Sequence, residues 1–246
     1  MSALGVEFEC VQEAFMNRIE YTGRANLEVM QEAKNYNRFL VELVLAQIRD
    51  SEFTVDFGAG SGTFSVPVAA VNRRLVCVET DPVLCAKLSE QGLKVVSSLD
   101  LLEDDSVDYL YTLNVLEHIE DDDATVTSWM QKLRPGGKLL VYVPAFDVLF
   151  SSMDRKVGHH RRYTKRVLMA KLKRAGFEVL DAKYADSLGY IATLIFKVIG
   201  NGEGTVNLGL LKAYDRFVFP LSRLLDFFVS SLFGKNVYAL AVKATK

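Results

Sequence analysis

The sequence is poor in cysteine, proline and tryptophan, and it has no long hydrophobic run. Its three cysteines lack the spacing of metal ligands, and we predict no metal site. No stretch of about 18 uncharged apolar residues occurs, so no membrane span is predicted. The first residues lack the basic and then apolar pattern of a signal peptide. Together with the odd number of cysteines, this favours a cytoplasmic protein.

The chain also has little net charge, because 29 Lys and Arg residues face 31 Asp and Glu residues. Such a balance predicts no general affinity for nucleic acid, and we expect no nucleic-acid partner. The charges are unevenly placed. Ten acids and no Lys or Arg lie between Ser97 and Ala124, whereas nine Lys or Arg and no acid lie between Arg155 and Arg174. The two blocks are either solvated faces, or the basic block faces an anionic substrate.

Short apolar runs alternate with amphipathic stretches along most of the chain. The predicted strands are Phe53–Val55, Leu75–Val78, Leu93–Val96, Val107–Thr112, Lys138–Val143 and Phe177–Leu180. The predicted helices include 7–20, 27–49, one after the glycines of 58–62, one starting at Asp81-Pro82, and Asp123–Leu133. This alternation indicates an α/β protein with a doubly wound parallel sheet. Ligands of such sheets bind outside the carboxyl ends of the strands, where the loops meet.

The loop after the first strand is rich in glycine and reads Asp56-Phe57-Gly58-Ala59-Gly60-Ser61-Gly62. Glycine allows the sharp turn and the close approach of a ligand to backbone N–H groups. Glu79, at the end of the next strand, can accept hydrogen bonds from both hydroxyls of a ribose. A dinucleotide fingerprint would need glycine where Thr63 stands, and no P-loop lysine follows. These features predict a cradle for an adenosine-bearing cofactor.

Four segments, in order and spacing, resemble the motifs of class I S-adenosylmethionine-dependent methyltransferases, in the small-molecule branch similar to methyltransferase types 11 and 12. They are 55–62, 76–82, 107–119 and 133–140. The resemblance implies S-adenosyl-L-methionine as cofactor and a Rossmann-like, seven-stranded sheet. Its last strand, Asn236–Val242, would run antiparallel.

The same resemblance implies roles for individual residues. Asp56, Gly58 and Gly60 would hold the methionine part of the cofactor, and Glu79 the ribose. After the third strand the family often has an aspartate for the adenine, whereas this chain has Ser98 and Leu99 there, with Asp100 one step on. The cofactor-binding residues so implied are Asp56, Gly58, Ala59, Gly60, Glu79, Thr80, Ser98, Leu99 and Asn114.

The loop after the fifth strand carries the candidates for catalysis. Its run from Asp154 through Gly158-His159-His160-Arg161-Arg162-Tyr163 resembles a signature of a bacterial methyltransferase subgroup linked to saccharide and lipid-carrier pathways. The candidate catalytic residues are His159, as base or substrate anchor, and His118. The candidate substrate-binding residues are Tyr36, His160, Arg161, Arg162 and Tyr163. Each has a structural alternative: an arginine salt bridge to Asp154 or Asp147, core packing of Tyr163, and capping or packing by His118.

We predict one methyltransferase domain in four parts. They are a helical cap (1–50), a cofactor-binding core (51–183), a helical insert (184–235) and the last strand (236–246). In the insert, an apolar stripe from Leu211 to Leu232 recurs at helical spacing, Pro220 is expected to kink or split the helix, and 200–204 looks like a hinge. We favour a lid whose stripe is buried on the domain. A dimer face or an interfacial helix beside a lipid-linked substrate is the alternative.

The expected reaction is methyl transfer from S-adenosyl-L-methionine to a small-molecule, saccharide or lipid-linked acceptor, at oxygen. A hydroxyl acceptor benefits from a base whose pKa is near neutrality, which favours histidine. The expected partners are therefore this acceptor and, through the insert, a second copy or a membrane surface. Two other functions stay open: an NAD- or nucleotide-sugar-binding oxidoreductase, and a non-catalytic cofactor-binding scaffold.

Overall fold

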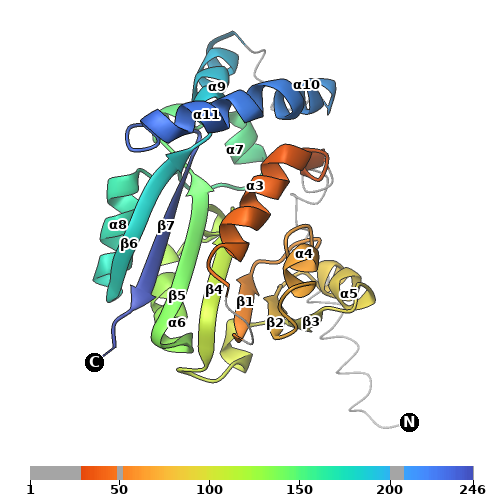
Figure 1. Cartoon of the computed structure of the whole chain (residues 1–246), viewed down its shortest axis with the longest axis vertical. Helices are drawn as coiled ribbons and strands as arrows, with labels where there is room; N and C mark the ends of the chain where they lie inside the picture. Colours follow the sequence, from red (N-terminus) through yellow and green to blue (C-terminus); the bar gives the residue numbers. More distant parts are fainter. Residues whose placement is uncertain (1–28, 49–51, 200–207, 246) are drawn as a thin grey trace, which may run out of the picture.

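The computed structural model describes residues 29–48, 52–199 and 208–245, which form a seven-stranded sheet flanked by helices (Figure 1). The strands are β1 (Thr54–Phe57), β2 (Leu75–Val78), β3 (Lys94–Val96), β4 (Val107–Leu113), β5 (Leu133–Pro144), β6 (Phe177–Ala185) and β7 (Asn236–Lys243). Their order is β3-β2-β1-β4-β5-β7-β6, and only β7 runs antiparallel to its neighbours. The predicted sheet and its antiparallel last strand are confirmed.

Helices cover both faces of the sheet. They are α3 (Lys34–Leu45), α4 (Ser65–Ala69), α5 (Pro82–Glu90), α6 (Asp122–Lys132), α7 (Ser152–Lys156), α8 (Lys165–Arg174), α9 (Ser187–Ile199), α10 (Leu208–Ala213) and α11 (Phe219–Val229). One core lies between the sheet and α6 and α8, around the fully buried Trp129 and Leu168. The other lies between the sheet and α3, α4 and α5, around Leu40, Val68 and Leu88. The side chains of Asp81 and Thr164 cap the starts of α5 and α8.

Two strands are longer than the sequence predicts. Strand β5 was expected over Lys138–Val143 but begins at Leu133, which pairs with Val107 of β4. Strand β6 was expected over Phe177–Leu180 but continues to Ala185, because β7 pairs with it that far. Residues beyond an apolar run are drawn into a strand when a partner supplies the ladder of hydrogen bonds. The helix predicted at 7–20 and the hinge at 200–204 lie outside the described residues.

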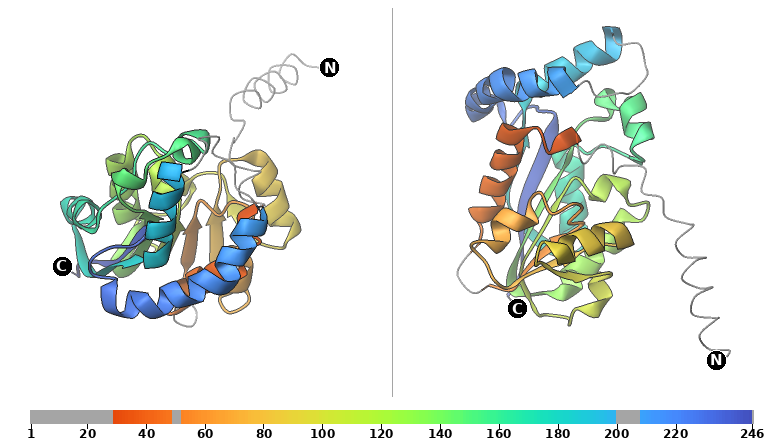
Figure 2. Two further views of the ribbon diagram at one scale, coloured as in Figure 1. Left: turned by 90° about the horizontal axis from the view of Figure 1, so that it is seen from above. Right: turned by 90° about the vertical axis from the view of Figure 1, so that its right-hand side faces the viewer.

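The insert crosses the carboxyl ends of the strands as α9, α10 and α11 (Figures 1 and 2). A π-helical segment, Tyr214–Val218, joins α10 to α11. Pro220 lies in the first turn of α11, directly after this π-helical segment, so the helical run is split close to Pro220, as one of the two predicted outcomes. No helix among the described residues is long and apolar enough to cross a membrane.

The buried face of the insert differs from the predicted apolar stripe. Leu221, Phe228 and Leu232 of that stripe are 58%, 76% and 68% exposed. The buried side chains are instead Phe219 and three polar residues, namely Asp215, Ser222 and Asp226. The expectation that the stripe packs on the domain therefore holds only in part, because its other members, Leu211, Tyr214, Val218 and Leu225, are half-buried.

The two buried carboxylates explain this inversion. Asp215 accepts hydrogen bonds from the backbone N–H groups of Asn35 and Tyr36 in the first turn of α3, each at 2.9 Å. Asp226 accepts two more from Asp186 and Ser187, where α9 begins, also at 2.9 Å. The first turn of a helix leaves its N–H groups without intrahelical partners and carries partial positive charge, so it attracts a carboxylate. Asp215 thus caps α3, and Asp226 caps α9 within the insert itself.

The two charge blocks of the sequence face each other. Asp122 and Asp123, at the start of α6, form ion pairs of 2.6–3.1 Å with three basic side chains. These partners are Arg161, Lys171 and Arg174. Neither expectation, two solvated faces or a basic surface kept for substrate, describes these residues. The pairs fasten α6 to α8 and to the loop before it.

Candidate active site

A cavity of about 740 Å³ opens at the carboxyl ends of the strands. The loops after β1, β2 and β3, with Asn114 and Val115 after β4, form one wall, and Glu117, His118 and residues 153–162 form another. The start of α3 and the insert complete it with Tyr36, Asp186, Tyr214 and Phe219. The cavity thus lies where a doubly wound sheet binds its ligands.

The glycine loop is shaped by its close neighbours. Gly58, Gly60 and Gly62 have φ of 81°, 57° and 83°, in the left-handed region that favours glycine. A Cβ on Gly58 would lie 2.4 Å from Cγ2 of Val115, so any side chain there would collide with the loop after β4. The backbone can therefore form a narrow cradle that a larger residue would fill.

Glu79 ties the glycine loop to the end of β2. One carboxylate oxygen accepts the backbone N–H of Gly60 at 2.8 Å, and the other accepts those of Thr80 and Asp81 at 2.8 and 2.9 Å. The side chain lines the cavity and is only 9% exposed. Each carboxylate oxygen accepts more than one hydrogen bond, so a ribose hydroxyl can still be held there.

Asp56 lies at the bottom of the cradle with 3% of its surface exposed. Its Oδ2 accepts hydrogen bonds from the hydroxyls of Ser65 at 2.6 Å and Tyr111 at 2.9 Å. Burial raises the pKa of Asp56 to about 7, although both hydroxyls favour the ionised form. A cationic group bound in the cavity would favour ionisation further.

The remaining residues predicted for the cofactor also line this cavity. They are Ala59, Thr80, Ser98, Leu99 and Asn114. Asn114 has φ of 56°, a left-handed conformation rare outside glycine, and its amide nitrogen lies 3.4 Å from the hydroxyl of Tyr36. All nine predicted cofactor residues thus share one wall, and their individual roles stay predictions.

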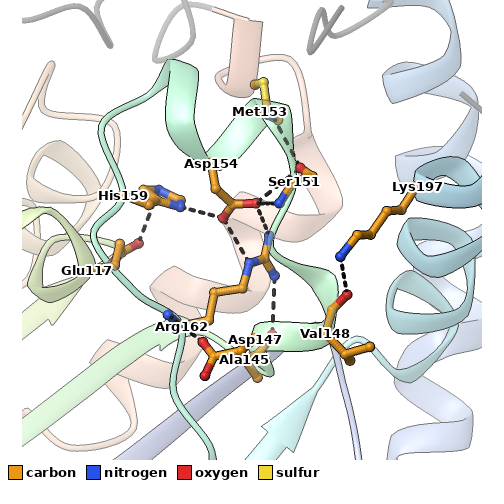
Figure 3. Close-up of polar contacts among 10 residues, drawn as sticks. All are labelled: Glu117, Ala145, Asp147, Val148, Ser151, Met153, Asp154, His159, Arg162 and Lys197. Atoms are coloured by element: carbon orange, nitrogen blue, oxygen red, sulfur yellow. Dashed lines mark hydrogen bonds and ion pairs between the residues drawn. The ribbon is translucent and has the colours of Figure 1, made fainter. Parts of the chain in front are cut away.

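The opposite wall carries a cluster of titratable side chains, which we call the Glu117 cluster: Glu117, His118, Asp154 and His159 (Figure 3 shows all but His118). His159 Nδ1 lies 2.7 Å from Asp154 Oδ1, and Nε2 of the same ring lies 3.9 Å from Glu117 Oε1. The rings of His118 and His159 meet edge to face, with 4.6 Å between centroids. The structure therefore brings together both predicted catalytic histidines.

Asp154 organises this wall. Besides His159 it binds Arg162 through two hydrogen bonds of 2.8 and 3.1 Å and accepts the backbone N–H of Ser151 at 2.8 Å. Burial opposes its ionisation, but the bonds from His159 and Arg162 prevail and hold its pKa well below the ordinary value. The contact of Nδ1 with Asp154 fixes the His159 ring so that its Nε2 is directed toward Glu117.

Burial shifts the pKa values of Glu117 and His118 in opposite directions. Burial raises the pKa of Glu117, whose side chain is 1% exposed, to about 8. Burial, followed by the charge of His159, lowers the pKa of His118 to about 4. Both shifts favour neutral forms in a site with little water. Glu117 Oε2 has no hydrogen-bond partner among the residues that the structure describes.

Several predicted substrate residues do not reach the cavity. The Tyr163 hydroxyl donates to Asp122 at 2.7 Å and its ring is 1% exposed, which is the core role weighed above. Arg161 pairs with Asp122, and His160 is exposed on the outer side of the loop. Arg162 lines the cavity, but its guanidinium is held by Asp154.

Sequence reasoning missed Glu117 and Asp154 as site residues, and the part of Asp186 and Tyr214 in the wall. Glu117 stands beside His118 at the end of a strand motif, and an acid before a histidine was the available signal. Asp154 was considered only as a salt-bridge partner. Asp186 and Tyr214 share a hydrogen bond of 2.5 Å and belong to the insert, whose placement gave no sequence signal.

Comparison with known proteins finds similarity to methyltransferases. Residues 55–139 match the family model described as a methyltransferase domain. A probable S-adenosylmethionine-dependent methyltransferase of Mycolicibacterium smegmatis is 30% identical over 134 residues, 52% of each chain. A probable ribosomal RNA small subunit methyltransferase A of Methanosphaera stadtmanae is 29% identical over 72 residues, 29% of this chain and 27% of that one. The chain thus spans about half or less of these relatives.

A solved structure extends the likeness over most of the chain. It is a chain in the complex between the Haloferax volcanii Trm112 methyltransferase activator and a putative methyltransferase. It superposes with a TM-score of 0.64 and 16% identity, over 93% of this chain and 99% of that one. At 16% identity, this similarity shows only that the two chains share a fold.

These relatives correct one expectation. Near-zero net charge led us to exclude a nucleic-acid partner, yet one relative is named as a ribosomal RNA methyltransferase and a structural neighbour is bound to a protein activator. A total charge of −2 says nothing of the local charge around a site, so the exclusion was wrong.

The residues fit the cofactor that the family uses. The Gly58 cradle leaves no space for a side chain, Glu79 keeps acceptor capacity toward the cavity, and Asp56 is buried where a cation would favour its ionisation. The methyltransferase-domain match over residues 55–139 and the order of the seven strands agree with the class I, S-adenosyl-L-methionine-dependent methyltransferases that the sequence motifs resemble.

Proposed function

We propose that this protein transfers a methyl group to a hydroxyl oxygen of a small acceptor, such as a saccharide or lipid-linked group. One observation supports the proposal: a single cavity is lined both by the residues predicted to bind the cofactor and by the Glu117 cluster. The cluster supplies side chains that can accept the proton of an acceptor hydroxyl or polarise its O–H bond. A carboxylate or phosphate acceptor would need no such groups.

The chain's own residues would divide the work as follows. When bound, S-adenosyl-L-methionine supplies an electrophilic methyl group. The glycine loop, Asp56 and Glu79 hold the donor, and the Glu117 cluster orients the acceptor hydroxyl and receives its proton. Asp154 acts as a positioning residue, because it fixes the tautomer and the direction of the His159 ring. The insert closes the cavity from above and limits water.

A nucleoside in RNA is the second candidate acceptor. The name of the Methanosphaera stadtmanae relative supports it, although the matched stretch covers 27% of that protein. The basic residues of the 155–174 block that we describe in ion pairs argue for the small acceptor, because their charge is already engaged within the domain.

A methyl-transfer assay on fractionated extract distinguishes the candidates. Tritiated S-adenosyl-L-methionine is incubated with lipid, saccharide, small-molecule and RNA fractions. We expect label in one of the first three that resists mild acid and base, as an ether does and a methyl ester does not. Label confined to RNA would replace the small acceptor by the second candidate. The Glu79→Ala variant is the control, because it should lose label in every fraction.

Calorimetry distinguishes S-adenosyl-L-methionine from NAD as the cofactor. We expect S-adenosyl-L-methionine to bind and NAD not to bind, and Glu79→Ala to weaken the cofactor by more than about tenfold, as the loss of charge-assisted hydrogen bonds implies. His159→Ala should leave cofactor affinity within about twofold, since that side chain lies on the opposite wall. Equal losses in both variants would show that the division of the cavity is wrong.

A further inference from the structure

We propose that Glu117, His118 and His159 form a site for one divalent first-row transition-metal ion, most simply Zn²⁺, at the acceptor end of the cavity. Each residue offers one ligand atom, and these atoms all lie within 4.8 Å of one another. Metal–nitrogen and metal–oxygen bonds of about 2.0–2.2 Å place ligand atoms at most about 4.4 Å apart, so side-chain shifts of about 1 Å suffice.

The shell around the three residues matches what a metal site needs. The carboxylate of Asp154 holds Nδ1 of His159 at 2.7 Å and leaves Nε2 directed toward Glu117 (Figure 3). The backbone of Gly158 and Val157 lies beside the His118 ring and counteracts part of the fall in its pKa. Metal-binding histidines almost always have their other nitrogen fixed in this manner, by a carboxylate or a backbone carbonyl.

Glu117 provides an independent sign of a missing ligand. Its side chain is 1% exposed, and Oε2 has no hydrogen-bond partner among the residues described. A buried acceptor without a partner costs about 1–3 kcal/mol, so such groups are rare unless something binds them. A cation between Glu117 and the two rings would satisfy this oxygen. The rival explanation is a protonated Glu117 that shares a proton with a water molecule.

The donor set selects the class of ion. Two imidazoles and one carboxylate suit Zn²⁺, Fe²⁺, Co²⁺ or Mn²⁺, whereas Mg²⁺ and Ca²⁺ prefer oxygen ligands alone. Three protein ligands leave a fourth position open, and all three residues line the cavity. This part of the inference rests on the proposed function: a hydroxyl oxygen of the acceptor in that position would release its proton to solvent more readily.

The test uses the full chain and measures metal rather than activity. The protein is stripped with a chelator, dialysed, and titrated with Zn²⁺ by calorimetry and with Co²⁺ by visible absorption. Bound metal after gel filtration is counted by elemental analysis. We expect one ion per chain and a Co²⁺ spectrum of low coordination number. Less than one tenth of an equivalent would overturn the proposal.

Variants locate the ion. His159→Ala and Glu117→Gln should weaken the affinity for Zn²⁺ by more than about 100-fold. Asp154→Asn should weaken it by about 10–100-fold, as is usual when a hydrogen-bond partner of a metal ligand is lost. His160→Ala is the matched control, because it removes an exposed histidine beside the site and should bind like the wild type. An equal loss in His160→Ala, or none in His159→Ala, would refute the assignment.

Failure of the metal site and failure of the proposed function can be told apart. Circular dichroism and calorimetry with S-adenosyl-L-methionine show whether each variant is folded and still binds the cofactor. If wild-type protein methylates an extract fraction without bound metal, and a chelator leaves the rate unchanged, the metal site is wrong and the proposed function stands. If it binds one Zn²⁺ but labels no fraction, the metal site stands alone.

Discussion

Replacing Asp154 with asparagine should destabilise this protein more than any change of equal size on its surface. The side chain is 1% exposed, and it faces the Arg162 guanidinium, whose side chain is 7% exposed. Asparagine keeps the shape but leaves this buried cation without its counterion. Breaking a buried ion pair by removing one partner costs about 3–5 kcal/mol, and we expect the free energy of unfolding to fall by that amount.

The loss of stability in Asp154→Asn should depend on pH. The pKa of Asp154 is lower in the folded protein than in the unfolded chain. Its ionisation therefore stabilises the fold above the unfolded pKa of about 3.9, and that stabilisation is lost as pH falls toward the folded pKa. The difference between wild type and Asp154→Asn should be full at pH 6–8 and shrink below about pH 4.

Urea unfolding, followed by circular dichroism at several pH values, measures both quantities. Asp181→Asn is the control: its pair with Lys183 joins side chains that are 44% and 48% exposed, and such pairs contribute about 0–1 kcal/mol. Arg162→Met and the double variant complete a mutant cycle, in which the pair should show coupling of more than about 1 kcal/mol. A loss for Asp154→Asn no larger than that of the control at pH 7 would refute the reasoning.

Three further predictions concern the cofactor wall and the insert. Because burial raises the pKa of Asp56 to about 7, S-adenosyl-L-methionine, which carries a cation, should bind about tenfold tighter at pH 8 than at pH 6 by calorimetry, and Asp56→Asn should abolish this dependence. Gly58→Ala should reduce cofactor affinity more than about 100-fold by the same method, because its Cβ would collide with Val115; unchanged binding would contradict the cradle. Asp215→Ala should lower the free energy of unfolding by about 1–2 kcal/mol and speed hydrogen exchange at the Tyr36 amide, whereas slow exchange there would exclude the capping role.

The parallel core could be predicted because its strands are buried on both faces. Leu75–Val78 is wholly buried, and a strand in such a position reads as a continuous apolar run. The glycine loop and Glu79 could also be predicted, because few residues tolerate a left-handed backbone and few buried strands end in a charged residue. The ends of the strands could not be predicted, since Ala185 joins β6 only through its pairing with β7.

The insert shows why the rest could not be predicted. Hydrophobic periodicity assumes that apolar side chains are the buried ones, but α11 buries Asp226 and exposes Phe227 by 85%. The reason lies in another part of the chain: the N–H groups that begin α9 need an acceptor, and Asp226 provides it. A pattern within one helix carries no information about the unpaired donors of its neighbour.

The loop from Asp154 to Tyr163 could be recognised as a motif in the sequence, but the contacts of its side chains could not be predicted. Its signature drew attention to histidines and arginines as substrate contacts, yet most of its members serve to hold one ring in place. Tyr163 anchors the loop to the start of α6, Arg162 neutralises Asp154, and Asp154 directs His159 toward Glu117. A short polar motif can therefore serve mainly to position one side chain, here the His159 ring, through contacts among its own members.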